Sequence, residues 1–199
     1  MAGKKAVLRV LAAFVVLVAL FAVALPAPAA ERGPVGLAAL DQLERLPYLW
    51  VGRQAHHFSS HDLTGGNSDR GNYVSQTGLT RTLFDAKGAG CIYRFWTTNQ
   101  YSSSNFTPTA HGNIQIFIDD NPTPVVDTTL ANFFSGTYSA FQFPFAGSPG
   151  DSSGGFYSYL PIPYRTACRI LWTAPSTDTP GMYYNIDYVT YDTPDGVTS

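Results

Sequence analysis

The chain has 199 residues, of which 45% are hydrophobic, 14% aromatic and only 13% charged, with a formal net charge of −2. A chain of this length is one domain, or one domain with a targeting segment. Without its first 29 residues it carries nine Lys and Arg against fourteen Asp and Glu, and a surface of that sign gains nothing from a phosphate backbone, so nucleic acid is excluded as an expected partner.

The first 29 residues have the three-part layout of a secretory signal peptide. Lys4, Lys5 and Arg9 precede the apolar run 10–25, and small residues at 27–30 suit cleavage. Sixteen apolar residues fall short of the ~20 that cross a bilayer comfortably. We therefore expect a secreted or extracytoplasmic protein with no stable membrane insertion after signal removal. The alternative is an uncleaved signal that anchors the chain in the membrane.

Residues 30–46 follow the signal with apolar side chains at helical spacing. Leu37, Leu40 and Leu43 recur every three residues, which predicts a short amphipathic N-terminal helix. Pro47 ends this pattern. We expect one jelly-roll domain over 47–192, and we interpret 193–199 as a linker or a truncation point.

Short strand-like segments separated by Gly, Pro, Ser and Asn fill the expected domain. Ile114, Ile116 and Ile118 alternate with other residues, which is typical of a half-buried strand. Short strands at such regular spacing predict an all-β fold, a jelly-roll β-sandwich. The expected strands cover 79–85, 91–98, 113–119, 125–126, 138–145, 156–162, 166–172 and 182–191.

Cys91 and Cys168 are the only cysteines, and each lies in a strand-like segment. An exported chain can form a disulfide. Two buried free thiols on neighbouring strands explain the same positions. The sequence leaves both alternatives open, and neither gives a catalytic thiol.

The polar loop from Ser59 to Tyr73, S-S-H-D-L-T-G-G-N-S-D-R-G-N-Y, carries more geometry-fixing side chains than a connector needs. The segment from Gly88 to Trp96 follows it with two glycines, one arginine and several aromatic residues. We expect these segments to form one wall of a polar cleft. The candidate substrate-binding residues are Asn67, Asp69, Arg70, Asn72, Arg94 and Trp96. The alternative is a structural loop in which Asp69 binds backbone amides of its own turn and Arg70 points outward.

Two groups in this region invite a metal interpretation. His56, His57 and His61 lack a Glu or Cys that would complete a zinc site. The acidic and amide side chains of the loop do not match a twelve-residue calcium loop. Phosphate-binding and dinucleotide-binding motifs are also missing from the sequence. We expect no metal and no cofactor.

Glutamate is scarce in this chain. The only two are Glu31 and Glu44, and none follows. Cleavage of a glycosidic bond usually requires two carboxyl groups, one as acid/base and one as nucleophile or base. The nucleophile-elbow motif G-x-S-x-G is absent as well. We therefore assign no catalytic residue and expect this chain alone to be inactive.

Five segments in order resemble the DUF2961 family, which is also classed as glycoside hydrolase family 172. They are the polar loop, G-A-G-C-I-Y-R-F-W, I-F-I-D-D-N-P-T-P, N-F-F-S-G and Y-L-P-I-P-Y, and they cover residues 46–192. The resemblance implies two tandem jelly rolls, assembly as trimers or multiples of trimers, and retaining cleavage of furanosides such as α-D-fructofuranosides, difructose dianhydrides or D-arabinan. It also implies that both catalytic glutamates belong to the second jelly roll. Leu63 departs from the family motif, where a basic residue is common.

The resemblance thus implies the N-terminal portion of an exported furanoside hydrolase. Its partners would be a furanoside carbohydrate and other copies of the same chain. The alternative is a non-catalytic module that binds carbohydrate or serves assembly. In the carbohydrate-binding case, Trp96, Tyr93 and Tyr101 are the expected stacking platforms.

Overall fold

The structure is a computed structural model that describes residues 33–45, 50–98, 111–138, 140–152, 154–177, 179 and 181–198. All of them belong to one compact unit, Arg32–Ser199. The expected signal peptide, 1–29, and Tyr101 lie outside the described residues. Among the helices that are described, none has the length and apolar character needed to cross a bilayer.

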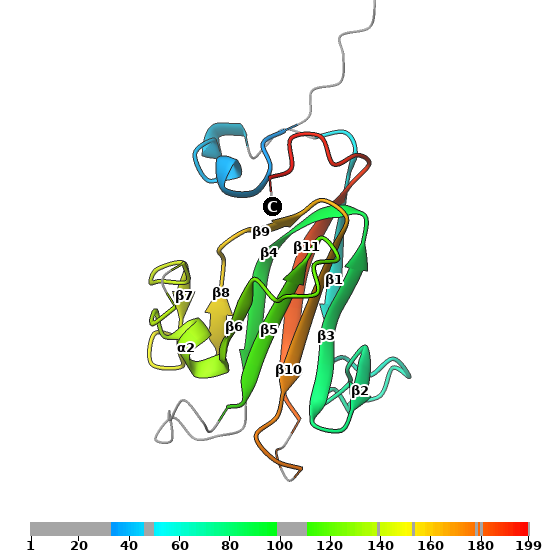
Figure 1. Cartoon of the computed structure of the whole chain (residues 1–199), viewed down its shortest axis with the longest axis vertical. Coiled ribbons are helices and arrows are strands. Elements are labelled where there is room, and N and C mark those ends of the chain that lie inside the picture. The colour runs from blue at the N-terminus through cyan, green and yellow to red at the C-terminus, as the bar shows by residue number, and fades with distance from the viewer. Residues whose placement is uncertain are drawn as a thin grey trace, which may run out of the picture. The chain divides into compact units, whose positions relative to one another are not determined.

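Two antiparallel sheets make up the domain (Figure 1). Sheet A has the strand order β1-β11-β4-β8-β7, with β9 also paired to β4. Its strands are β1 (Arg53–Ser59), β4 (Ala89–Thr98), β7 (Ala146–Gly147), β8 (Phe156–Ser158), β9 (Ile162–Tyr164) and β11 (Tyr183–Tyr191). Sheet B has the order β2-β3-β10-β5-β6. Its strands are β2 (Ser75–Thr77), β3 (Thr80–Lys87), β5 (Asn113–Ile118), β6 (Val126–Thr129) and β10 (Ala167–Thr173).

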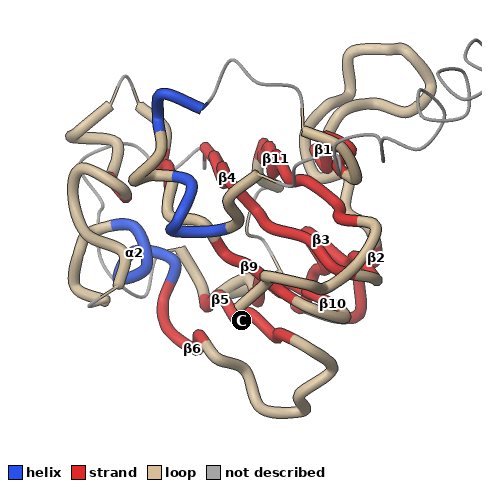
Figure 2. Tube along the Cα trace, turned by 90° about the horizontal axis from the view of Figure 1, so that it is seen from above, coloured by secondary structure: helices blue, strands red, loops and turns tan. Residues whose placement is uncertain are grey.

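The sheets form two layers, which Figure 2 shows from above, and the prediction of an all-β sandwich is confirmed. Consecutive strands repeatedly change sheet, as in β3 to β4, β4 to β5 and β10 to β11. Such crossings are typical of jelly-roll connections. Alternation of side chains in β5 and β10 places Ile114, Ile116 and Ile170 between the layers, where each is fully buried.

Aromatic side chains dominate the core between the sheets. Trp172 is fully buried, and its indole Nε1 donates a hydrogen bond to the His111 carbonyl at 2.8 Å. At one side of the core, short helix α2 (Leu130–Phe134) contributes Phe133 and Phe134. The Thr129 side chain caps this helix by accepting a hydrogen bond from the Asn132 amide at 3.1 Å.

Two expected elements are wrong. The single amphipathic helix expected over 30–46 is replaced, within the described part, by two 3-10 helices, η1 (Gly36–Ala39) and η2 (Leu43–Arg45). Its leucines do not form one buried stripe, because Leu37 and Leu43 are 58% and 61% exposed. The expected strand at 138–145 consists of turns, since only Phe141 of its phenylalanines is buried and Phe143 and Phe145 are exposed.

The segment expected to be a linker packs against the sandwich in its described part. Val197 is 1% exposed, and its carbonyl accepts a hydrogen bond from Arg165 Nη1 at 2.7 Å.

Cys91 and Cys168 are both buried and free. Burial raises the pKa of the Cys91 thiol to about 12 and raises that of Cys168 as well. Cys168 belongs to the core. Cys91 lies on the opposite face of β4 from its neighbour Ile92, which is a core residue. The structure therefore has the two buried free thiols of the second alternative, but they lie on strands of different sheets, β4 and β10, and not on neighbouring strands.

Candidate functional site

The polar loop connects β1 to β2 and lies beside β2 in Figure 1. Both of its ends are tied to the start of β11. The Ser60 amide donates to the Tyr184 carbonyl at 3.1 Å, and the Tyr184 amide donates to Ser60 Oγ at 3.1 Å. At the other end, the Gly71 amide donates to the Met182 carbonyl at 3.2 Å. Both ends of the loop are thus held at the same place, the start of β11.

Asp62 organises the first turn of the loop. Its carboxylate accepts hydrogen bonds from Thr64 Oγ1 at 2.7 Å, the Thr64 amide at 2.9 Å and the Ser68 amide at 3.2 Å. These bonds, led by the one from the Thr64 hydroxyl, lower the pKa of the Asp62 carboxyl below its ordinary value. Asp62 is therefore a carboxylate that holds the turn together by accepting these hydrogen bonds.

Asp69 and Asn72 also hold the loop together. Asp69 Oδ1 accepts from the Asp62 amide at 2.8 Å. Asn72 Nδ2 donates to the Ser68 carbonyl at 2.7 Å and to the Ser60 carbonyl at 3.0 Å. These contacts are those of the structural alternative, in which the carboxylate of Asp69 binds a backbone amide of its own turn. Sugar binding by Asp69 or Asn72 stays a prediction.

Asn67 and Arg70 occupy different positions in the same loop. Both side chains are exposed. Asp69 and Asn72 thus fix the shape of the loop, whereas Asn67 and Arg70 are exposed on it. Of these four residues, only Asn72 lines the groove beside the loop.

An open groove of about 370 Å³ runs beside the loop. Tyr73 is part of its wall, and the Tyr73 hydroxyl accepts a hydrogen bond from the Met182 amide at 3.1 Å. The other lining residues are Asp62, Leu63, Thr64, Gly71, Asn72, Ser75 and Gln76. Hydroxyl, amide and carboxylate groups on one open wall suit a hydroxylated ligand.

Arg81 lies behind Tyr73 and was not predicted from the sequence. Its side chain is 6% exposed, and its guanidinium carbon lies 5.5 Å from the Tyr73 ring centre and 4.8 Å from that of Trp172. Its Nη1 donates to the Leu79 carbonyl at 3.1 Å. A cation placed over two aromatic faces is attracted by both rings. Arg81 thereby positions the ring that borders the groove.

Arg94 and Trp96 lie elsewhere, on the outer face of sheet A, and neither lines the groove. Arg94 Nη1 donates to Asp187 Oδ2 at 2.9 Å, and His57 Nδ1 lies 2.5 Å from Asp187 Oδ1. Partial burial opposes ionisation of Asp187, but the hydrogen bonds from Arg94 and His57 outweigh it and lower the pKa of Asp187. The single cleft predicted from the sequence is therefore two separate places.

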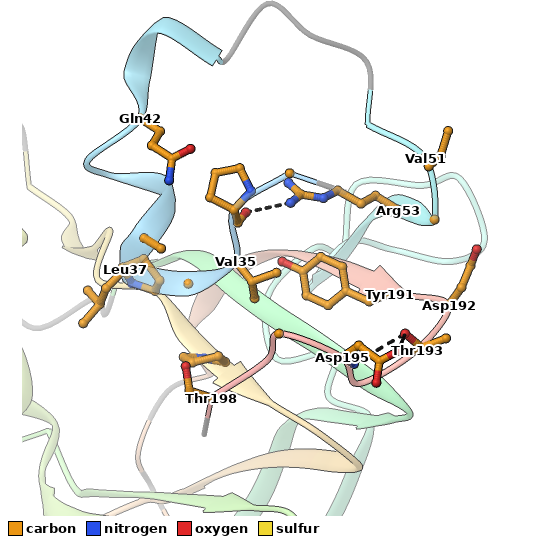
Figure 3. Close-up of a pocket in the computed structure, with 18 residues that line it drawn as sticks. Val35, Leu37, Gln42, Val51, Arg53, Tyr191, Asp192, Thr193, Asp195 and Thr198 are labelled. Atoms are coloured by element: carbon orange, nitrogen blue, oxygen red, sulfur yellow. Dashed lines mark hydrogen bonds between the residues drawn. The ribbon is translucent and has the colours of Figure 1, made fainter. Parts of the chain in front are cut away.

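A further cavity of about 440 Å³ is at a third place (Figure 3). It lies between the 3-10 segment, the start of β1 and the chain after β11, and it was not predicted from the sequence. Arg53 crosses it and donates from Nη2 to the Pro34 carbonyl at 2.6 Å. Thr193 Oγ1 donates to Asp195 Oδ2 at 2.9 Å on the other side. Arg53 also lies over the Trp50 and Tyr191 rings. The cavity is therefore a place where the N-terminal segment packs against the ends of β1 and β11.

The three histidines near the loop are used separately. His57 contacts Asp187, His56 Nε2 lies 3.0 Å from Thr190 Oγ1, and His61 Nδ1 lies 2.8 Å from Ser59 Oγ. Over the described parts of the chain, no group of three or more His, Cys, Asp or Glu side chains is placed to hold a metal ion.

Comparison with known proteins gives the affiliation. The family model of the GH172 first beta-sandwich domain, where GH172 is glycoside hydrolase family 172, matches residues 51–199. A comparison with curated proteins found no match. The matched range contains the polar loop, both sheets and the chain after β11. The chain therefore belongs to glycoside hydrolase family 172 and contains the first β-sandwich domain of that family.

Proposed function

We propose that this chain is the N-terminal portion of an exported glycoside hydrolase that cleaves fructofuranoside or D-arabinofuranoside linkages with retention. The observation that carries the proposal is the match to the first sandwich domain of the family over most of the chain. We propose that a second sandwich supplies the two catalytic glutamates. The absence of glutamate after Glu44 in this chain supports that assignment. Assembly as a trimer or a multiple of trimers is part of the same proposal.

The polar loop contributes substrate contacts in this proposal. Its backbone is held by Asp62, Asp69 and Asn72, so its outward groups do not have to be ordered when a sugar binds. Asn67 and Arg70 are the groups that donate hydrogen bonds to sugar hydroxyls. Binding residues often lie on loops that a rigid scaffold positions, and two sheets supply that scaffold here.

The test compares loop variants of the full-length hydrolase on a 4-nitrophenyl furanoside. Asn67→Ala and Arg70→Ala are expected to lower kcat/KM by about tenfold each, the loss of one hydrogen bond to a sugar hydroxyl, and the Tm of each variant is measured beside kcat/KM. Val125→Ala, at an exposed position next to β6, is the control and should change neither quantity.

Asp69→Ala completes the series. It removes an acceptor of the Asp62 amide and should lower Tm, because a hydrogen bond that fixes the loop is lost. Unchanged kcat/KM in both Asn67→Ala and Arg70→Ala would show that the loop is scaffolding and that its substrate role is wrong.

A further inference from the structure

The outer face of sheet A carries a band of aromatic and polar side chains that the groove does not include. Side chains at paired positions of neighbouring antiparallel strands share one face. Trp96 is paired with Asn185 on β11 and with Tyr157 on β8, and Arg94 is paired with Asp187. On β1, His57 is paired with Asp187, so the band crosses four adjacent strands. It contains Trp96, Tyr157, Asn185, Arg94, Asp187 and His57.

The Trp96 and Tyr157 rings of the band lie flat against the sheet. A methyl group built on Gly155 would overlap the Trp96 indole, and one built on Gly147 would overlap the Tyr157 ring. Each ring thus occupies the space of a missing side chain on the next strand. A ring that lies along the sheet turns a face outward, and both rings remain half-buried rather than covered.

Further aromatic side chains continue the band at the β7–β8 edge. The Tyr157 and Tyr159 rings are 5.4 Å apart, and the Tyr159 amide donates to the Phe145 carbonyl at 2.7 Å. Tyr159 and Phe145 are 49% and 43% exposed. The aromatic part of the face therefore extends from the centre of the sheet to its edge.

The polar part of the band is held in one geometry. Asp187 binds Arg94 through one carboxylate oxygen and His57 through the other. The three side chains nevertheless keep 34%, 42% and 45% exposure for Arg94, Asp187 and His57. Their remaining hydrogen-bonding groups face solvent in a fixed arrangement, beside the outward faces of two rings.

We infer that this band is an oligosaccharide-binding platform, separate from the groove of the polar loop. One face of a sugar ring presents C–H groups that pack on an aromatic face, whose negative quadrupole attracts them. The hydroxyl groups at the edge of the sugar then meet Asn185 and the charged row, which form strong hydrogen bonds because they are ionised or pre-oriented. The furanosyl class of the sugar rests on the proposed function, whereas the platform itself does not.

A protein partner fits this face less well. The centre of a protein–protein interface is depleted of charged side chains. Here Arg94 and Asp187 lie beside Trp96 on the inner strands β4 and β11, and His57 lies next to Asp187 on the edge strand β1. A second copy of the chain would have to desolvate all three, whereas the hydroxyl groups of a sugar replace their water.

The test is a titration of the 15N-labelled chain with an inulin-derived fructo-oligosaccharide, followed by the indole N–H signals in NMR spectra. The Trp96 signal should move, because its ring is part of the platform. The Trp172 signal should not move, since that indole is buried and bound to the His111 carbonyl. An unmoved Trp96 signal at millimolar oligosaccharide would overturn the inference, and so would a Trp96 signal that moves with protein concentration alone.

Variants locate the binding. Because Trp96→Ala removes the indole signal, the affinities of the variants are measured by isothermal titration calorimetry. Trp96→Ala should weaken binding by about tenfold, and Asn185→Ala should weaken it by about threefold. Phe117→Ala is the matched control, because Phe117 lies under Arg169 on sheet B at 4.9 Å. An unchanged Trp172 signal shows that a variant is folded. Equal weakening by Phe117→Ala and Trp96→Ala would contradict the platform.

Cellohexaose, a pyranosyl oligosaccharide, separates this inference from the proposed function. Binding of the fructo-oligosaccharide alone supports the furanosyl class. Binding of cellohexaose alone, with the same variant pattern, would leave the platform in place and contradict furanosyl specificity. Loss of turnover in the Asn67 and Arg70 variants tests the proposed function without reference to either sugar titration.

Discussion

At the scale of single residues, acidic side chains in this domain serve mainly to fix geometry. Asp62 and Asp69 bind backbone amides, and Asp187 joins two strands to a third through Arg94 and His57. Because ionised carboxylates are strong acceptors, the contacts of Asp62 and Asp187 favour the charged form and lower the pKa of both carboxyl groups. The charge state of the domain is thus coupled to its folding.

Replacing Arg94 with Gln tests this coupling. Asp187 has a lowered pKa in the folded protein, so its contribution to stability is present above its unfolded value near 3.9 and is lost as pH falls through the lower folded value. The variant should lose about 0.5 kcal/mol of unfolding free energy at pH 7, a small effect because both side chains are partly exposed. Urea unfolding at pH 7 and pH 2.5 measures it.

The difference between wild type and Arg94→Gln should shrink towards zero at the lower pH. A difference of the same size at both values would mean that Arg94 acts by packing and not through the Asp187 carboxylate.

At the scale of elements, the sequence could predict strands wherever alternation decides burial. The segments around Ile114, Ile170 and Ile186 became β5, β10 and β11 because one face of each is buried. Alternation misled at 138–145, where Phe141 packs on α2 while Phe143 and Phe145 face solvent. The three phenylalanines alternate as in a strand, but they do not share one buried face, so the segment forms turns.

The sequence predicted which residue types form the candidate site, but it did not predict which contacts each side chain makes. The glycines, acids and amides of the polar loop marked a tight, polar turn, which the structure has. Whether each polar side chain faces the loop or the solvent depends on hydrogen bonds that form only when the loop is folded, and the sequence does not show them. Asp187 was missed as a site residue because it is 93 positions away from Arg94, and strand register brings them together.

Gly112 gives a prediction for the element that leads into β5. It has φ of 73°, and a methyl group there would overlap the Thr173 carbonyl of β10. Gly112→Ala should therefore cost about 3 kcal/mol or more, the sum of left-handed strain and an overlap with backbone. Thermal and urea unfolding measure the loss.

Gly78 is the matched control for this prediction. It has φ of 58°, but nothing lies within 4 Å of the added methyl group. Gly78→Ala should cost only about 1 to 2 kcal/mol from the left-handed backbone. Equal losses in the two variants would show that the approach of Gly112 to β10 is looser than described.

At the scale of the whole molecule, the sandwich presents three separate surfaces: the groove beside the polar loop, the band on sheet A and the cavity around Arg53. None of them brings a glutamate together with a second carboxyl group, because the described part of this domain after Glu44 contains no glutamate. In the proposed function, this domain contributes to sugar binding and a second domain supplies the catalytic groups.

The rate of 4-nitrophenol release from a 4-nitrophenyl furanoside by the purified 199-residue chain tests the central claim most directly. The claim is that this chain is the non-catalytic first sandwich of a furanoside hydrolase. The predicted result is a rate equal to that of buffer, with the Asp69→Asn variant at the same rate. Release above buffer that disappears in Asp69→Asn, while the Tm of that variant is unchanged, would show that this domain carries its own catalytic carboxylate and would contradict the claim.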